Sequence, residues 1–412
     1  MKKLILFLAF LSLALASKVQ AQDFNLAAQN GIAIEAQTGK VLYEKEATNP
    51  VPIASLSKIL TAYLVYEAIE QGKLSMESQV EISDHAYQLT TNYSISNLPM
   101  EKRSYSVKEL LEAMLIANAN SAAIALAEKV AGSEKDFVDL MKARMEKWGV
   151  SDSTLVNASG LNNKILGQHI YPGSKEDEEN KMSAYGLALV SYHLITDYPQ
   201  VLKISQKSQS TFDGWAISNS NYMLKDQAYF RPGVEGLKTS TSQEAGNSFV
   251  STSKEKGMQL ITVVLKADKS DTDPFSHFSA TADFLDYLTQ NFIPTKVLAK
   301  GKGLAESKLA VSNGKNNKIQ AVANQDLVWI QKLDSDKKVK LEFKAKQGQL
   351  EAPIKARQEL GQVSYQDPEI IGRGYIEGQG PSVSMLAQKK VERSNFLKIW
   401  WNNFVKFVNE KL

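Results

Sequence analysis

Ser55 and Lys58 are the residues of this sequence whose types and spacing could support covalent chemistry. They stand three positions apart at the start of a long apolar run, and in a helix such side chains share one face, about 5–6 Å apart at Cβ. Serine is a weak nucleophile that needs an adjacent base, and lysine can serve when burial and nearby cationic charge lower its pKa. A helix N-terminus adds positive charge that favours an alkoxide and a later oxyanion. The pair therefore indicates a serine nucleophile with a lysine base.

The Ser-x-x-Lys spacing alone is not specific, because four other serines also begin it, namely Ser251, Ser253, Ser312 and Ser335. Only Ser55 is followed by a run that is apolar on nearly every side of a helix and that closes at Gly72. Such a helix is buried, so the sequence predicts that Ser55 and Lys58 lie at the inner end of a central helix. The alternative left open by the motif is a serine that caps the helix beside a solvated lysine.

Residues 1–21 have the features of a secretory signal peptide. Lys2 and Lys3 precede an apolar stretch over residues 4–16. Val19-Gln20-Ala21 then supplies small residues before a cleavage site, so we expect the mature protein to act outside the cytoplasm. The chain has no cysteine and forms no disulfide, and its stability must come from hydrophobic cores. With 412 residues, 43% of them hydrophobic, it is long enough for two or three domains.

The charge balance argues against nucleic acid as a partner. The chain has 48 basic and 45 acidic residues, a formal charge of +3. Three of the basic residues are lysines of the leader, so the remaining 45 basic residues balance the 45 acidic ones. A neutral mature chain lacks the basic surface that nucleic acid requires. The four histidines do not have the spacing of zinc ligands, and we expect neither a metal nor a cofactor. They are His85, His169, His193 and His277.

Residues 22–292 are predicted to form one domain of helices and strands. A strand pair with a glycine turn precedes the Ser55 helix, and Ser106 and Glu109 form a capping box that opens another helix. That helix breaks at residues 117–120, where a polar gap between apolar helices can present side chains to a cleft. Further helices and then strands are predicted at 134–148, 183–197, 248–251 and 258–265. Consecutive late strands with covering helices predict an α/β (α+β) domain with an antiparallel sheet.

Residues 293–387 are predicted to form a small all-β domain. Short alternating runs are separated there by Gly, Asn, Asp or Pro. The runs lie at 308–311, 318–322, 327–330, 339–343, 361–365, 370–376 and 382–386. The segment has no cluster of His, Cys or paired acids, so we interpret it as a spacer or docking module.

Residues 388–412 have the pattern of an amphipathic membrane-anchor helix. The apolar residues fill about half of the helical circumference. Between Lys389 and Leu412 six basic residues outnumber two acidic ones, a charge of +4. Polar interruptions prevent this helix from spanning a bilayer, and tandem Trp400 and Trp401 suit the headgroup region. We expect it to hold the protein at the extracellular face of the cytoplasmic membrane, and packing onto its own protein is the alternative.

Two further motifs follow Ser55-x-x-Lys58, namely Asn118-Ala-Asn120 and Lys238-Thr239-Ser240. With this set, the whole chain resembles the serine D-alanyl-D-alanine carboxypeptidases, the low-molecular-weight penicillin-binding proteins, and particularly their streptococcal members. The family motifs are Ser-x-x-Lys, Ser-x-Asn and Lys-Thr-Gly, so here Asn118 stands in place of a serine and Ser240 in place of a glycine. The resemblance implies a serine β-lactamase/DD-peptidase-like domain with its sheet between helical layers.

By this resemblance, Ser55 attacks the carbonyl between the two terminal D-alanines of a peptidoglycan stem peptide, with Lys58 as the base. Asn120 holds the substrate amide. Lys238 attracts the terminal carboxylate and helps to keep Lys58 neutral. Release of D-alanine leaves an acyl-enzyme that water resolves.

The resemblance also implies further contacts. Asn118, Thr239 and Thr241 are expected to contribute to substrate binding, and the backbone N–H groups of Ser55 and Thr241 are expected to form the oxyanion hole. A β-lactam antibiotic mimics the dipeptide and acylates the same serine.

Two other functions stay open at this point. A class A β-lactamase shares these motifs but needs a glutamate to activate the deacylating water, and Asn157-Ala-Ser-Gly-Leu161 carries no acid. A membrane-tethered muropeptide- or penicillin-binding module with weakened chemistry is the other. Release of D-alanine from a pentapeptide distinguishes an enzyme from such a module.

Overall fold

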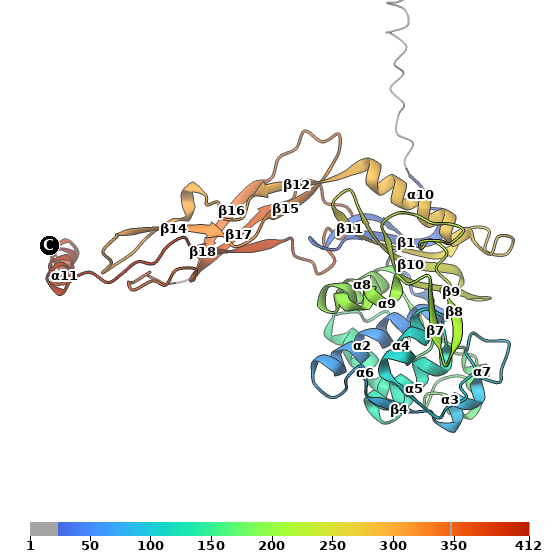
Figure 1. Cartoon of the computed structure of the whole chain (residues 1–412). Helices are drawn as coiled ribbons and strands as arrows, with labels where there is room; N and C mark the ends of the chain where they lie inside the picture. The colour runs from blue at the N-terminus through green and yellow to red at the C-terminus, as the bar shows by residue number, and fades with distance from the viewer. Residues whose placement is uncertain (1–23, 347, 412) are drawn as a thin grey trace, which may run out of the picture.

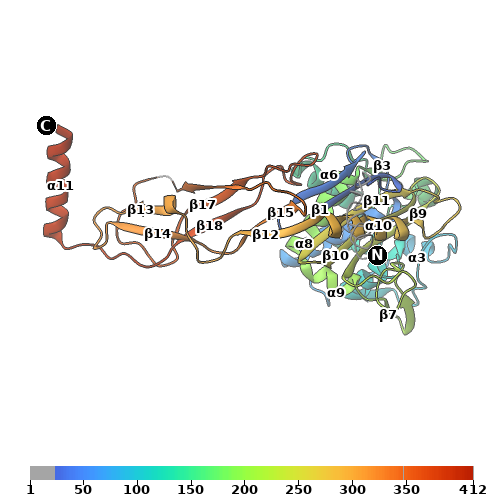
Figure 2. The ribbon, with the colours of Figure 1, turned by 90° about the horizontal axis from the view of Figure 1, so that it is seen from above.

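The molecule is elongated. The computed structural model describes residues 24–346 and 348–411, so the predicted leader over residues 1–21 lies outside the described residues. A rounded N-terminal domain is followed by a slender β domain, and helix α11 (Phe396–Lys411) lies at the far tip (Figure 1). Seen from above, α11 runs across the long axis of the β domain (Figure 2). The C-terminal helix is therefore remote from the N-terminal domain.

Five antiparallel strands form the main sheet of the N-terminal domain, in the order β2-β1-β11-β10-β9. Their bounds are β1 (Ala28–Glu35), β2 (Lys40–Lys45), β9 (Val234–Ser242), β10 (Gly246–Glu255) and β11 (Met258–Ala267). The inner strands β1, β10 and β11 are buried along most of their length, because helices cover both faces of the sheet. β9 lies at the edge and has one neighbour, so alternate N–H groups of β9 are free of the sheet.

Helices form a layer on each side of this sheet. α10 (Ser276–Asn291), which is not among the predicted elements, packs through Phe278, Phe284 and Leu288 on one face. α8 (Ala184–Asp197) contacts β1 and β11 from the opposite side (Figure 1). The layer around α8 contains η1 (Ala54–Ser57), α2 (Lys58–Glu70), α3 (Asp84–Leu89), α4 (Val107–Leu115), α5 (Asn120–Ala131), α6 (Glu134–Lys147), α7 (Asn163–Leu166), η2 (Gly167–His169), η3 (Pro199–Val201) and α9 (Leu202–Ser205). The predicted antiparallel sheet between helical layers is confirmed.

Three short strand pairs join the loops of this domain. They are β3 (Val51–Pro52) with β6 (Lys181–Met182), β4 (Gln79–Glu81) with β5 (Ser104–Ser106), and β7 (Gln209–Phe212) with β8 (Trp215–Ser218). The capping box predicted at the start of α4 is present, with Ser106 and Glu109 each bonded to the other's backbone N–H.

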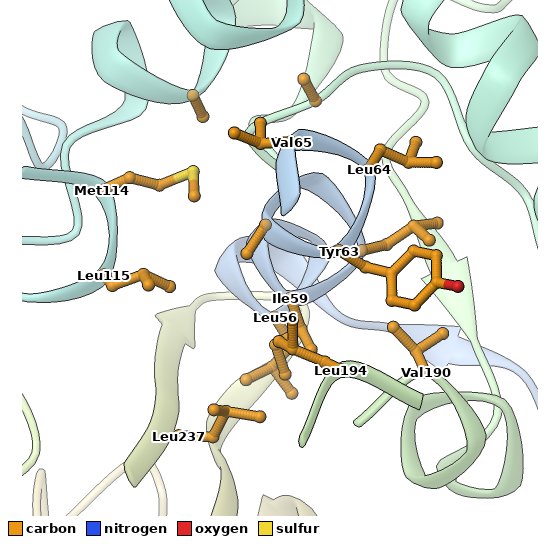
Figure 3. Packing of buried hydrophobic residues seen from close by; sticks show 14 of the residues in the cluster. Leu56, Ile59, Tyr63, Leu64, Val65, Met114, Leu115, Val190, Leu194 and Leu237 are labelled. Carbon is orange, nitrogen blue, oxygen red and sulfur yellow. The ribbon is translucent and has the colours of Figure 1, made fainter. Parts of the chain in front are cut away.

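α2 is the centre of the helical layer, as the sequence predicted. Ten of its 13 residues are buried. Figure 3 shows Leu56 and Ile59 packed against Leu194 of α8 and Leu237 of β9. Ser55 lies in the 3₁₀ turn η1, which leads directly into α2. The apolar packing on every side therefore fixes the turn that carries the candidate nucleophile.

The β domain contains two antiparallel sheets. β12 (Phe292–Leu298) pairs with β15 (Leu327–Lys332), and the other sheet has the order β13-β14-β18-β17-β16. Its elements are η4 (Ala305–Ser307), β13 (Lys308–Ala310), β14 (Lys318–Ala323), β16 (Lys340–Ala345), β17 (Glu359–Gln366) and β18 (Ser382–Ala387). The prediction of an all-β domain is confirmed, but the predicted boundary between residues 387 and 388 is too early. Val391 is buried in the core of the β domain and pairs with Ile354, and α11 begins only at Phe396. The predicted boundary between residues 292 and 293 falls at the start of β12.

The strand predicted at 370–376 is wrong. This segment is a loop, with Gly372 and Gly374 at φ of 50° and 81°. Its partners lie on the N-terminal domain, where the Val41 N–H donates to the Gly374 carbonyl and the Ile376 N–H donates to the Gly39 carbonyl. The apolar residues that suggested a strand are needed for docking, and Ile376 is fully buried in the core of the N-terminal domain.

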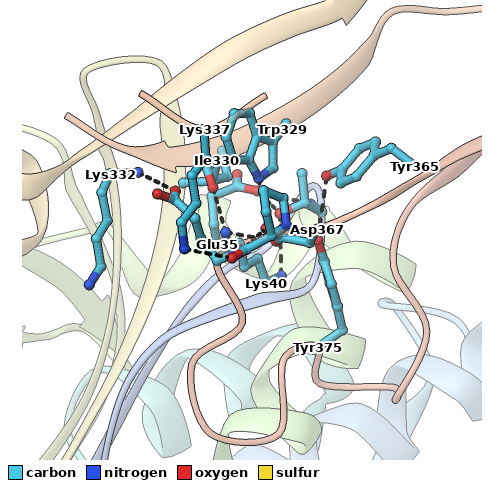
Figure 4. Close-up of polar contacts among 12 residues, drawn as sticks. Glu35, Lys40, Trp329, Ile330, Lys332, Lys337, Tyr365, Asp367 and Tyr375 are labelled. Carbon is cyan, nitrogen blue, oxygen red and sulfur yellow. Dashed lines mark hydrogen bonds and ion pairs between the residues drawn. The ribbon is translucent and has the colours of Figure 1, made fainter. Parts of the chain in front are cut away.

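A buried ion pair also joins the two domains (Figure 4). Lys40 Nζ lies 2.7 Å from Asp367 Oδ2 and 2.6 Å from the Ile330 carbonyl oxygen, and the two charged side chains are each 1% exposed. Trp329 Nε1 and the Tyr375 hydroxyl donate to the same carboxylate at 3.0 and 2.8 Å. Since each oxygen of the carboxylate has partners, the pair fixes how the β domain leaves the N-terminal domain.

Candidate active site

Lys58 lies at the centre of a group of hydrogen bonds. Its Nζ is 3.0 Å from Ser55 Oγ, 2.7 Å from Asn120 Oδ1 and 2.9 Å from the Ser159 carbonyl oxygen. Burial, helped by the charge of Lys238, holds the pKa of the Lys58 ammonium well below its usual value. A neutral amine can accept the serine proton. The structure thus brings Ser55, Lys58 and Asn120 into one cluster.

The capping interpretation of Ser55 is wrong. The N-cap residues of η1 and α2 are Ile53 and Ser57, and neither makes a side-chain cap. The Ser55 hydroxyl is instead directed to Lys58.

Lys238 of β9 is a second buried lysine in the cluster. Burial lowers the pKa of Lys238 to about 7, and its Nζ donates to the Thr239 carbonyl at 3.2 Å. Its charge acts on Lys58. Among the described residues no acidic side chain forms an ion pair with either lysine, so the cluster has cationic character that suits an anionic ligand.

A close-fitting loop supports η1 from below. Gly160 has φ of 83°, and a Cβ on it would lie 1.8 Å from the Ala54 carbonyl oxygen, so only glycine fits there. The neighbouring Ser159 supplies the carbonyl that accepts from Lys58. Asn180, fully buried, donates to Ser57 Oγ at 2.8 Å and thereby ties a second loop to the turn. These contacts fix the backbone on both sides of Ser55.

The predicted break between helices is confirmed. The two asparagines that it carries lie in different environments. Asn120 begins α5, and its N–H and its Nδ2 both donate to the Ser96 carbonyl, which leaves Oδ1 for Lys58. Asn118 has φ of 61°, a left-handed conformation that asparagine adopts more readily than most residues. Its Oδ1 is buried and has no hydrogen-bond partner within the described chain.

The Ser240 side chain contacts the turn that carries Ser55. The resemblance implied that the backbone N–H of Ser55 helps to form an oxyanion hole. In the structure that N–H donates to Ser240 Oγ at 3.1 Å, and the Ser240 hydroxyl donates to the Ile53 carbonyl at 3.1 Å. The cause is the hydroxymethyl group itself, since a glycine at this position has no atom that could reach η1.

The other two predicted residues of β9 are held by hydroxyl contacts. Thr239 Oγ1 lies 2.7 Å from Ser220 Oγ. Thr241 Oγ1 donates to Asn247 Oδ1 of β10 at 3.2 Å, so the proton of this hydroxyl is directed away from Ser55 and Lys58.

Several residues of the cluster could not be found by motif. Ser96 and Ser159 act through backbone carbonyls, which any residue type could supply. Asn180 ends an acidic run, 175–180, that has the composition of a surface loop. Ser220 carries a hydroxyl but belongs to no recognised spacing. Three-dimensional proximity was the missing information.

The histidines lie apart from this cluster. Two that are distant in sequence, His85 and His169, stack at a centroid separation of 3.8 Å, and His193 stacks on Trp148 at 4.3 Å. Over residues 24–346 and 348–411, no group of three or more His, Cys, Asp or Glu side chains is arranged to hold a metal ion.

Comparison with known families decides the class of this site. The profile of the D-alanyl-D-alanine carboxypeptidase family matches residues 16–269, more than half of the chain. The chain belongs to this family. The predicted class of serine-type DD-carboxypeptidase, within the penicillin-binding proteins, is thereby confirmed. Residues 292–393 match the C-terminal domain of penicillin-binding protein 5.

Individual relatives agree with this assignment. D-alanyl-D-alanine carboxypeptidase DacF of Bacillus subtilis is 29% identical over 412 residues, which cover 98% of this chain and 97% of DacF. The crystal structure of a peptidoglycan synthesis regulatory factor, PBP3 of Streptococcus pneumoniae, is 50% identical and covers 90% of this chain and 100% of its own, with a TM-score of 0.86. Penicillin-binding protein D2 of Listeria monocytogenes, in its ampicillin-bound form, is 30% identical over 64% of this chain and 98% of its own, with a TM-score of 0.54.

Proposed function

We propose that Ser55 attacks the amide carbonyl between the two terminal D-alanines of a peptidoglycan stem pentapeptide while Lys58 Nζ takes the hydroxyl proton. The observation that carries this proposal is the 3.0 Å contact between Ser55 Oγ and a buried lysine whose pKa is lowered. Cleavage of the amide releases D-alanine, whose nitrogen receives a proton, and leaves an ester on Ser55. Water then hydrolyses this acyl-enzyme.

Three further residues support the reaction in this proposal. Asn120, held by Ser96, presents its amide beside Lys58 and the substrate amide. Lys238 offers a cation without a carboxylate partner, and the D-alanine carboxylate would fill that role and hold the ammonium charged. Thr239, on the edge strand, lies beside the substrate. A β-lactam places its ring carbonyl at Ser55 in the same way and acylates it.

The alternatives predict different products. The 157–161 loop supports Lys58 and η1 and carries no acid that could activate water as in a class A β-lactamase. A binding module without turnover can be distinguished from the enzyme only by an assay, which measures release of D-alanine from a pentapeptide.

Intact mass after incubation with penicillin is the decisive first measurement. We expect one adduct per chain in the wild-type protein, no adduct in Ser55→Ala, and release of D-alanine from a pentapeptide by the wild type only. Folding of the variant is checked by its unfolding temperature. An adduct that persists in Ser55→Ala would remove Ser55 as the nucleophile, and an adduct without D-alanine release would favour the binding module.

We also propose that the leader exports the protein and that α11 anchors it to the outer face of the cytoplasmic membrane. The supporting observation is an exposed apolar face on α11, formed by Phe396, Leu397, Trp400, Trp401, Phe404 and Val405. In the part of the chain that is described, no helix has the length and apolar character to cross a bilayer. An interfacial helix with basic residues favours anionic lipid.

Vesicle binding tests the anchor. The mature protein is expected to sediment with anionic vesicles at low salt. A chain ending at Asn395, which lacks α11 but keeps the buried Val391 of the β domain, is expected to stay in solution while still forming the penicillin adduct. Trp400→Ala with Trp401→Ala should weaken binding without change in acylation. Failure of the mature protein to sediment would refute the anchor.

A further inference from the structure

The Ser240 hydroxyl is bonded to the same turn that carries the nucleophile. It accepts from the Ser55 N–H and donates to the Ile53 carbonyl, both at 3.1 Å. Ser240 is 2% exposed, so solvent does not compete for these bonds. Two bonds, one of each polarity, hold this hydroxyl in one orientation.

A serine hydroxyl has a single proton to donate. Because that proton is directed to the Ile53 carbonyl, Ser240 presents only lone pairs to the Ser55 N–H. Lone pairs repel the negative oxygen of a tetrahedral intermediate. Ser240 therefore cannot act as an additional oxyanion donor without giving up the bond to Ile53.

We propose that Ser240 is a positioning residue that occupies the oxyanion donor of the free enzyme and so limits acylation of unstrained peptide carbonyls. This inference rests on the proposed role of Ser55. To bind the oxyanion, the Ser55 N–H must leave Ser240 Oγ or divide its bond between two acceptors. This exchange is needed only as negative charge develops on the carbonyl oxygen. Its energy cost therefore lowers the rate of bond formation more than it weakens the initial binding of substrate.

The proposal also makes Ser240 a determinant of specificity. A strained β-lactam carbonyl reacts with less help from the oxyanion hole than a peptide carbonyl does. Occupation of the Ser55 N–H therefore slows peptide turnover more than penicillin acylation. The preference for β-lactam over peptide would lie in a hydroxyl outside the three catalytic groups Ser55, Lys58 and Asn120.

A peptide boronic acid that ends in a D-alanine analogue isolates this effect. The Ser55 oxygen forms a bond to boron, its proton passes to Lys58, and the resulting tetrahedral boronate bears the negative charge with no leaving group. We compare the wild type with Ser240→Ala, which removes the hydroxyl, and Ser240→Gly, which removes the whole side chain. Both variants are expected to bind the boronate about tenfold more tightly, since one competing hydrogen bond is lost. In both, kcat for the pentapeptide should rise by a similar factor with KM nearly unchanged.

Ser248 provides a matched control. It is a buried serine paired with Ser240 across β9 and β10, and its hydroxyl also makes two backbone contacts, to the Ala245 carbonyl and the Lys266 N–H. Ser248→Ala should leave boronate affinity unchanged. This comparison separates the loss of a specific hydrogen bond from a general loosening of the strand pair.

Each outcome is decisive. Weaker or unchanged boronate affinity in both Ser240 variants overturns the proposal, and a gain in Ser240→Gly alone overturns it in favour of steric bulk at Cβ. If Ser55→Ala still forms the penicillin adduct, the nucleophile assignment fails and this inference fails with it. If Ser55→Ala abolishes the adduct while Ser240 variants behave as wild type, this inference alone is refuted.

Discussion

Replacing Asn118 by serine should raise peptide turnover more than it raises penicillin acylation. A serine hydroxyl both donates and accepts through one atom, so it can relay a proton to the leaving amine. An asparagine amide donates through nitrogen and accepts through oxygen, and does not readily pass a proton along. A positioned proton relay is typically worth about 10²–10⁴-fold in rate. We expect D-alanine release to increase by at least about tenfold, as part of that factor is recovered.

The effect of Asn118→Ser on stability should be small, because two contributions oppose each other. The buried Oδ1 of Asn118 lacks a partner, a condition that costs about 1–3 kcal/mol, and the substitution removes it. Serine tolerates φ of 61° less well than asparagine, and left-handed backbone costs about 1–2 kcal/mol for ordinary residues. The net change in unfolding free energy is then within about 1 kcal/mol of zero.

The assay measures D-alanine release from a pentapeptide and the second-order rate of penicillin acylation in the same preparations. Asn118→Ala is the matched control, because it removes the unpartnered oxygen and has the same backbone strain but offers no hydroxyl. We expect the alanine variant to stay as slow as the wild type on peptide. Equal peptide turnover in the wild type and Asn118→Ser would refute the relay argument, and an equal gain in Asn118→Ala would assign the improvement to relieved packing.

Three other perturbations test the scaffold. Burial, with a smaller effect of Glu128, raises the pKa of Glu134 from 4.5 to about 7, so the stability that depends on its protonation is complete below pH 4.5 and is lost as pH rises through 7. At pH 8 the free energy of unfolding of Glu134→Gln should therefore exceed that of the wild type by about 3 kcal/mol, with little difference at pH 4.5. If unfolding of the variant depends on pH as that of the wild type does, this prediction is contradicted. Lys40→Met leaves a buried carboxylate without its cation, and urea unfolding should show a loss of about 3–5 kcal/mol; a loss below 1 kcal/mol would show that the ion pair does not hold the junction. Gly160→Ala should abolish penicillin labelling or folding, whereas Gly149→Ala, also at positive φ but in open space, should keep labelling, and equal behaviour of the two would refute the close-contact argument.

The parts of the fold that follow from local sequence were predictable. Ser55 and Lys58 are near in space because they are near in sequence, and the polar break before Asn120 is visible as a change in periodicity. The hydrogen bond between Ser55 and Ser240 joins residues 185 positions apart, and the one between Lys58 and Ser159 joins residues 101 positions apart. No periodicity records such pairings.

The docking loop and Ser240 show why composition misleads in specific places. Apolar residues at 370–376 suggested a strand because burial and strand formation favour the same residue types, yet here the burial is provided by another domain. The sequence identified Ser240 as a departure from a glycine but did not indicate where its side chain points. The hydroxyl points toward η1, and that orientation is what engages the Ser55 N–H.

The crosswise terminal helix has a consequence for how the enzyme meets its substrate. With α11 flat in a membrane interface, as proposed, the β domain stands away from the bilayer, and the buried Lys40–Asp367 pair keeps the catalytic domain from folding back (Figures 1 and 4). Diffusion is then confined to two dimensions, and only stem peptides within one layer of the wall come within reach. The rate of turnover on the cell would then depend on the number of stem peptides per unit area in that layer. The concentration of a stem peptide in free solution would be a poor guide to that rate.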